Sequence, residues 1–188
     1  MAETPSLNPM TDLNCVEKAQ SGDRMAFRTL VLENSDAMHR LALRLTGSES
    51  AAQDVVQDAW IKAHRNLDRF DGRARFGTWV HRITVNTALD HMRRQKSRQR
   101  VEVESSGEEL PAAAAAQSCP AEQQDLISKT LGALQKLTDM ERSAFTLRHF
   151  EGHSIREICE LLGIRNSACK QAIFRAVNKM RDHLEALA

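Results

Sequence analysis

The C-terminal third of the chain takes its fold from residues 138–163, which read TDMERSAFTLRHFEGHSIREICELLG. Thr138 and Ser154 are each followed three residues later by a glutamate, and this capping-box pattern marks the first turn of a helix. Gly163 suits the left-handed position that ends the second of these helices. Two short helices, a turn and a further basic helix at this spacing indicate a helix-turn-helix.

Apolar residues around this stretch repeat at helical spacing, so we expect four helices from residue 122 onward. Gly152 is expected to end the second helix, and Asn166 is expected to cap the last one. The four expected core faces are Leu126, Ile127, Leu131, Leu134 and Leu137; Ala144, Phe145 and Leu147, with Phe150 as a further candidate; Ile158, Leu161 and Leu162; and Ile173, Val177, Met180 and Leu184.

The last helix is expected to bind DNA, because residues 163–181 hold five bases and no acid. In a helix-turn-helix the second helix enters the major groove, where its exposed N-terminal residues meet base edges and nearby bases contact phosphate. Gln171 can pair with adenine, whereas Arg and Lys read guanine or neutralise phosphate. The alternative is a solvated charged face on a helical hairpin. The candidate contact residues are Arg165, Asn166, Ser167, Lys170, Gln171 and Arg175.

The first half of the chain predicts a second helical module, at residues 12–98. Gly22, Gly47 and the loop of residues 72–77 interrupt otherwise continuous helical periodicity. Ser48 is placed to cap the helix that follows it. No segment has the alternating pattern of a strand. The residues expected to face the core are Leu30, Val31, Leu41, Leu45, Val55, Val56, Ala59, Ala63, Trp79, Val80, Ile83, Ala88 and Leu89.

Aromatic residues and arginines are interleaved around the loop of residues 68–76. Aromatic faces stack on unpaired bases of any sequence, so this loop is a candidate site for single-stranded nucleic acid. Trp79 has the spacing of a core residue, whereas Phe70 lies in a glycine-containing loop and is the better candidate for stacking. The long helix that follows ends in a basic run at residues 91–100, which suits backbone phosphate. The arginines of this module include Arg69, Arg73, Arg75, Arg82, Arg93 and Arg94.

An acidic segment separates the two modules. Residues 101–125 hold six acids and no base, with five consecutive alanines and two prolines nearby. Such a segment has too few large apolar groups to offset its ordering entropy, so it is expected to be a flexible linker. The chain is therefore predicted to be all-α, with a disordered tail at residues 1–11, a helical domain at 12–98, a linker at 99–121 and a helix-turn-helix domain at 122–188.

Composition disfavours several other classes of protein. The net charge is only +1 because the basic and acidic segments cancel each other, so the total does not reveal the basic segments. The four cysteines form no CxxC pair, and there is no signal peptide or membrane span, so we expect a cytoplasmic protein. No phosphate-binding glycine loop or nucleophile elbow suggests an enzyme, and no cofactor is implied.

The histidines and cysteines of the C-terminal module allow two further readings. Their irregular spacing disfavours a metal site, and redox sensing by an exposed Cys169 beside Lys170 is a minor alternative. The candidate metal ligands in this module are His149, His153, Cys159 and Cys169.

The sequence resembles a known family, the extracytoplasmic-function (ECF) sigma factors of the sigma-70 type. DVVQDAW at residues 54–60, RFDG at 69–72 and FGTWVHRITVN at 76–86 resemble region two of these factors. LRHFEGHS at residues 147–154, the stretch through Gly163 and FRA at 174–176 resemble region four. The resemblance covers nearly the whole chain in the expected order, with an acidic linker in the expected place.

The resemblance implies a role for each module. Asp54, Gln57 and Asp58 match the helix that docks on the clamp helices of core RNA polymerase; without the family they would be surface charges, with Asp58 paired to Lys62 four residues on. The second module would read the −35 element of promoter DNA. Core polymerase, through its clamp helices and flap, promoter DNA and an anti-sigma factor are the implied partners. The implied −10 residues are Phe70, His81 and Asn86, which match a pocket for a flipped base, with Arg82, Arg93 and Arg94.

One stretch departs from the family. Residues 168–172 read ACKQA, where the family usually has TVKSR, so the arginine expected at position 172 is missing. We therefore expect an unusual −35 preference that depends on Gln171. A stand-alone helix-turn-helix regulator is the alternative function, but it leaves the basic, aromatic-rich first half unexplained.

Overall fold

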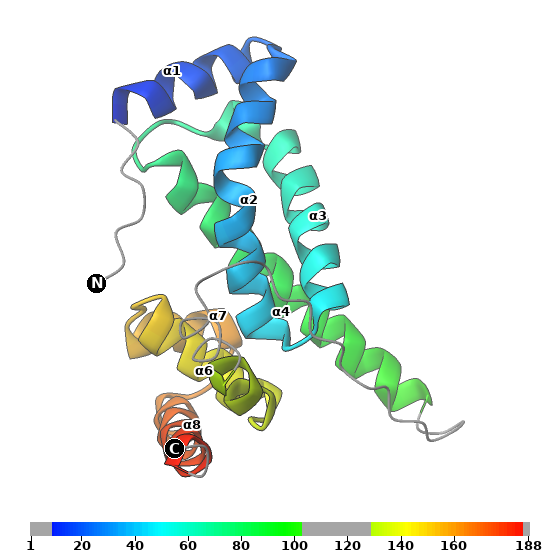
Figure 1. The fold of residues 1–188 in the computed structure, drawn as a ribbon, viewed down its shortest axis with the longest axis vertical. Helices are drawn as coiled ribbons and strands as arrows, with labels where there is room; N and C mark the ends of the chain where they lie inside the picture. Colours follow the sequence, from blue (N-terminus) through cyan, green and yellow to red (C-terminus); the bar gives the residue numbers. More distant parts are fainter. Residues whose placement is uncertain (1–8, 103–128, 186–188) are drawn as a thin grey trace.

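The computed structural model describes residues 9–102 and 129–185, and Figure 1 shows their arrangement. Every regular element within these two ranges is a helix, which confirms the all-α prediction. None of the described helices is long and apolar enough to cross a membrane.

The N-terminal module contains four α-helices and one short 3-10 turn. They are α1 (Pro9–Gln20), α2 (Arg24–Thr46), α3 (Glu49–Arg65), η1 (Leu67–Arg69) and α4 (Phe76–Glu102). Ser48 caps α3 as predicted, accepting a hydrogen bond from the Ala51 amide. Helix α1 begins inside the stretch predicted as a tail, and α4 continues past residue 99, where the linker was expected to start. The rest of that predicted linker lies outside the described residues.

Helices α2, α3 and α4 pack side by side, and α1 crosses one end of this bundle (Figure 1). The predicted core faces are largely confirmed, because most of these side chains are buried and only Val31, Val56, Trp79 and Ile83 are half-buried. Helical spacing identified these positions because each helix of a bundle has one continuous apolar stripe. The bundle presents the exposed faces of α3 and α4 for other contacts.

The C-terminal module is the predicted helix-turn-helix. Residues 129–135 are helical and are followed by α6 (Asp139–Phe145), a π-helical turn η2 (Thr146–Phe150), α7 (Ile155–Leu162) and α8 (Asn166–Glu185). Both capping boxes form, with Thr138 bonded to Glu141 and Ser154 to Glu157. Gly163 has a φ of 66° and donates its amide to Cys159, which ends α7 as predicted. The predicted core residues Leu126 and Ile127 lie outside the described residues.

The prediction for the core face of α8 was right at Met180, which is buried, and was wrong at Leu184 and in part at Ile173 and Val177. Ile173 and Val177 are only half-buried, and Leu184 is exposed. Helix α8 packs on α6 and α7 through small side chains, which allow a close approach that larger neighbours would prevent. Phe150, the last residue of the π-helical turn, is also exposed. The buried residues of α8 are Cys169, Ala172, Ala176 and Met180.

The two modules pack against each other. Leu45 of α2 and Val85 of α4 belong to the same apolar cluster as Leu147 and Ile158 of the C-terminal module. In Figure 1, α6 and α7 lie at the C-terminal end of α2, and α8 lies beyond them. This packing decides which surfaces of each module stay open.

Candidate nucleic-acid and polymerase interfaces

The exposed face of α8 contains the predicted −35 residues. Arg165 precedes the helix, Asn166 and Ser167 begin it, and Lys170, Gln171 and Arg175 follow on its next turns; all are exposed. Sequence reasoning missed Phe174, which is 66% exposed among these residues. The sequence signal for Phe174 is a large apolar side chain at a helical position that does not face the core. Such a side chain can contact a thymine methyl group.

Position 172 does not belong to this exposed face. Ala172 is 2% exposed and packs in the apolar core beneath α8. Ala172 therefore contributes to packing inside the module and not to the exposed face of α8. It leaves the exposed residues around Gln171 as the part of α8 that can read bases.

The predicted redox alternative fails at Cys169, because this thiol is buried and not exposed beside Lys170. Burial, together with a hydrogen bond to the Cys159 thiol, raises the pKa of Cys169 to about 11. The thiolate is the reactive form, and so Cys169 is a packing residue of the helix-turn-helix.

The predicted −10 surface lies mainly along α4. Arg82, Asn86, Arg93 and Arg94 are exposed, and His81 is half-buried. Helical spacing places Arg82, Asn86 and Arg93 on one face of α4 over about three turns, with His81 and Arg94 on either side of that face. Such a surface can follow a nucleic-acid strand and contact it at several points.

Phe70 lies at the edge of this surface but is only 8% exposed. Its ring contacts Phe76 and Trp79, with centroid distances of 5.6 and 5.4 Å. The Gln20 side chain donates hydrogen bonds to the carbonyls of Leu67 and Phe70 and holds the loop against the bundle. Trp79 is thus the more available of the two rings, the reverse of the expectation from loop position.

Glu151 of the C-terminal module contacts the −10 surface. One carboxylate oxygen bonds His81 Nε2 at 2.5 Å, and the other accepts a hydrogen bond from Arg44 at 3.0 Å. Burial works to raise the pKa of Glu151, but the hydrogen bond and charge of His81, with those of Arg44, lower it below the usual value. No local sequence signal marks Glu151, because its partners are far away in the chain.

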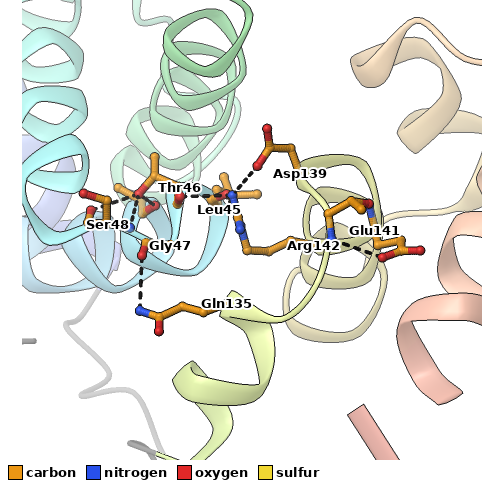
Figure 2. A network of polar contacts seen from close by, with 10 residues as sticks. Leu45, Thr46, Gly47, Ser48, Gln135, Asp139, Glu141 and Arg142 are labelled. Atoms are coloured by element: carbon orange, nitrogen blue, oxygen red, sulfur yellow. Dashed lines mark hydrogen bonds and ion pairs between the residues drawn. The ribbon is translucent and has the colours of Figure 1, made fainter. Parts of the chain in front are cut away.

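Arg142 makes a second connection between the modules (Figure 2). Its guanidinium donates to the carbonyls of Leu45 and Thr46 at 2.9 and 3.0 Å, at the end of α2, and pairs with Asp139 at 2.7 Å. A positive charge at this position satisfies the last carbonyls of the helix and complements its dipole. Arg142 therefore holds α6 against the end of α2.

The predicted polymerase-docking residues lie on α3. Asp54, Gln57 and Asp58 are exposed, and none of them makes a side-chain hydrogen bond or ion pair to another described residue. The expected pair between Asp58 and Lys62 is wrong, because Lys62 turns toward α4 and donates to Thr87 at 3.1 Å. This leaves a row of free acceptor groups on α3.

Known proteins with similar sequences decide the family. Residues 30–98 match sigma-70 region 2, and residues 129–180 match sigma-70, region 4. The ECF RNA polymerase sigma-E factor of Escherichia coli K12 is 32% identical, over 95% of this chain and 96% of the relative. The chain belongs to the ECF sigma factor family. Another relative, the RNA polymerase sigma-H factor of Pseudomonas aeruginosa, is 31% identical over 94% of this chain and 95% of its own length.

Two solved structures resemble this ECF sigma factor. The sigma factor RpoE of Bartonella quintana, in complex with the anti-sigma factor NepR, has a TM-score of 0.60 and 25% identity, covering 85% of this chain and 96% of the other. CnrH, in complex with the cytosolic domain of CnrY, has a TM-score of 0.54 and 26% identity over 94% of this chain and 99% of the other. As an alternative sigma factor, this protein directs transcription initiation; sigma factors are DNA-binding initiation factors.

Proposed function

We propose that the module at residues 12–98 docks on core RNA polymerase and recognises and melts the −10 element, while the module at 122–188 reads the −35 element. The observation that supports the −35 role most directly is the exposed face of α8 over residues 166–181, which contains bases and no acid, at the second helix of a helix-turn-helix. The protein would act in the bacterial cytoplasm, with each module contacting its own promoter element.

The −35 contact depends on the first turns of α8. Arg165, Lys170 and Arg175 neutralise phosphates or read guanine, and Asn166, Ser167 and Gln171 offer polar groups to base edges. Phe174 adds an apolar contact to this surface. Gln171 is the residue with the most specific chemistry, because its amide can both donate to and accept from adenine.

The −10 contact depends on α4. His81 and Asn86 offer hydrogen-bonding groups to an unpaired base, and Arg82, Arg93 and Arg94 hold the backbone of the strand. The buried ring of Phe70 supports this surface by packing beneath Trp79. Unstacking of the target base is then offset by these contacts.

The polymerase contact depends on α3. Asp54, Gln57 and Asp58 present acceptor groups on one face of an exposed helix, which suits a basic surface such as the clamp helices. The flap is the expected partner of the C-terminal module. We also propose control by an anti-sigma factor, because the similar sigma factor RpoE of Bartonella quintana is in complex with the anti-sigma factor NepR, and the similar protein CnrH is in complex with the cytosolic domain of CnrY.

In vitro transcription with core polymerase, on a promoter library varied at both elements, tests the proposed function. We expect transcripts only when the protein is added, with sequence selection at both −35 and −10. Tight, sequence-specific binding of duplex promoter by the isolated chain, without any transcription, would instead favour a stand-alone helix-turn-helix regulator.

A further inference from the structure

Lys179 is a base of α8 that lies outside the predicted −35 residues. It is one of the five bases in residues 163–181 and follows Arg175 by four positions, so the two side chains are neighbours on one edge of the helix. Helix α8 packs on α6, and both side chains are exposed. Lys179 thus extends the basic surface of α8 by one turn.

One buried carboxylate holds both of these bases. Glu141, in the first turn of α6, accepts a hydrogen bond from Lys179 Nζ at 2.8 Å, and its other oxygen lies 3.8 Å from Arg175 Nε. The Glu141 side chain points toward α8 (Figure 2) and is only 7% exposed, whereas those of Arg175 and Lys179 are 61% and 45% exposed. Glu141 therefore contacts the two bases on the side that faces away from solvent.

The contacts of this carboxylate exceed what its helix cap requires. Glu141 completes the capping box by accepting a hydrogen bond from the Thr138 amide at 3.1 Å, and a glutamine at this position would complete it equally well. Burial works to raise the pKa of Glu141, but the bonds from Lys179 and Thr138 lower it below 4.5, so the side chain is charged at neutral pH. The hydrogen bonds of the cap do not need this negative charge, whereas the contact with the two bases of α8 does.

The remaining donors of the two bases are free to contact DNA. Lys179 uses one N–H group on Glu141 and keeps the others, and Arg175 approaches Glu141 through Nε, which leaves its terminal guanidinium nitrogens. Backbone phosphates lie at the edges of a groove that holds a recognition helix, and side chains that are already held in place lose less rotamer entropy on binding them. Two positive charges against one carboxylate leave this edge of α8 positive, so it still attracts phosphate.

We propose that Glu141 is a positioning residue for the −35 contact, which holds Arg175 and Lys179 in place to bind DNA phosphates, and that Lys179 is a further phosphate contact. The inference rests on the proposed −35 role of α8 and adds a connection between α6 and the DNA backbone. Glu141 then acts on the affinity for the promoter, and the later steps of initiation do not depend on it.

The test uses holoenzyme, assembled from core polymerase and the full-length chain, on the best promoter of the transcription library. Transcription over a series of promoter concentrations measures a half-saturating concentration, which reports binding, and a maximum, which reports the amount of active holoenzyme. Glu141→Gln retains the cap but loses the charge, and Glu160→Gln, which removes an exposed carboxylate paired within α7, is the matched control. We expect Glu141→Gln to raise the half-saturating concentration about fivefold at an unchanged maximum, as for coupled neighbouring charges, and the control to match the wild type.

A double-mutant cycle separates positioning from a loss of stability. When Arg175→Gln and Lys179→Gln are already present, Glu141→Gln should change the half-saturating concentration by less than about twofold, because no base is left to position. A merely structural role would instead lower the maximum in both backgrounds. Lys179→Gln alone should reduce the slope of log affinity against log salt by about one, as for one phosphate contact, while Lys18→Gln, at an exposed position of α1, should leave the slope unchanged.

An unchanged or lower half-saturating concentration for Glu141→Gln, or an equal loss in both backgrounds, would overturn the positioning role. An unchanged salt slope for Lys179→Gln would overturn the phosphate contact. If Glu141→Gln loses helix signal in circular dichroism, this slope decides, because a purely structural Lys179 would leave it as in the wild type. Failure of the proposed −35 role gives a different result, since Lys170→Ala and Gln171→Ala would then also leave promoter binding and −35 selection unchanged.

Discussion

Lys170 and Gln171 are neighbours on the exposed face of α8, but their chemistry predicts different effects on promoter binding. Lys170→Ala should weaken transcription from all −35 variants by a similar factor, because a lysine that neutralises phosphate contributes without regard to sequence. Gln171→Ala should reorder the preferred −35 sequences, with a change of about 1–3 kcal/mol at the base it reads. Transcription from the −35 library measures both, and equal losses on every sequence for both substitutions would contradict the role of Gln171.

Gly47 is a second residue whose identity the structure explains. Its φ of 71° lies in the left-handed region, and an added Cβ would approach the Arg142 guanidinium to 3.1 Å. Gly47→Ala should therefore reduce the free energy of unfolding by about 1–3 kcal/mol, measured by urea denaturation. Gly132→Ala is the matched control, because it lies in a helix with nothing within 4 Å of the added Cβ, and it should stabilise by about 0.5–1 kcal/mol. Equal effects of the two substitutions would contradict this account.

At the scale of elements, the start of α6 is connected to α8 through one carboxylate. Glu141 forms the capping box with Thr138 and accepts a hydrogen bond from Lys179 at 2.8 Å, with Arg175 3.8 Å away. Burial works to raise the pKa of Glu141, but the bonds from Lys179 and Thr138 outweigh it, so the pKa lies below the ordinary 4.5. The carboxylate therefore stabilises the fold fully above that ordinary value, and this contribution is lost as pH falls through the lowered pKa.

Glu141→Gln should accordingly destabilise the protein by about 1–2 kcal/mol at neutral pH. The difference from the wild type should shrink as pH falls below 4.5, as followed by thermal unfolding in circular dichroism. Glu160→Gln removes an exposed carboxylate from the same module, and its effect should stay below about 0.5 kcal/mol. A difference for Glu141→Gln that grows on acidification would show that the sign of the pKa shift is wrong.

The helices and their ends were largely predictable, because caps and periodicity act within a few residues. Ser48, Thr138, Ser154 and Gly163 all perform their predicted roles. The π-helical turn η2 had no such signal, and the helix after Asp139 changes register at Thr146. The buried face of α8 was only partly predicted: Met180 is buried as expected, but size and hydrophobicity favoured Ile173 and Val177 over the small neighbouring residues that are buried.

At the scale of the whole molecule, the free face of α3 predicts how the protein meets polymerase. Asp58→Lys should weaken binding to core polymerase by at least about tenfold, because it places a positive charge against a basic surface. The change should leave thermal stability nearly unaffected, since Asp58 is exposed and unpaired among the described residues. Asp36→Lys, on an exposed position of α2, is the control with the same charge change. If surface plasmon resonance shows that both variants bind core polymerase equally well, α3 is not part of the interface.

The sequence by itself determined the helices, the helix-turn-helix and the row of basic residues on α8, because each depends on neighbours within one or two turns. Only the tertiary structure decided that Phe70 is buried, that Ala172 faces the core, and that Glu151 lies on His81, seventy residues away in the chain. These outcomes depend on how helices pack and on which polar groups then need partners. Local pattern contains no information about such contacts.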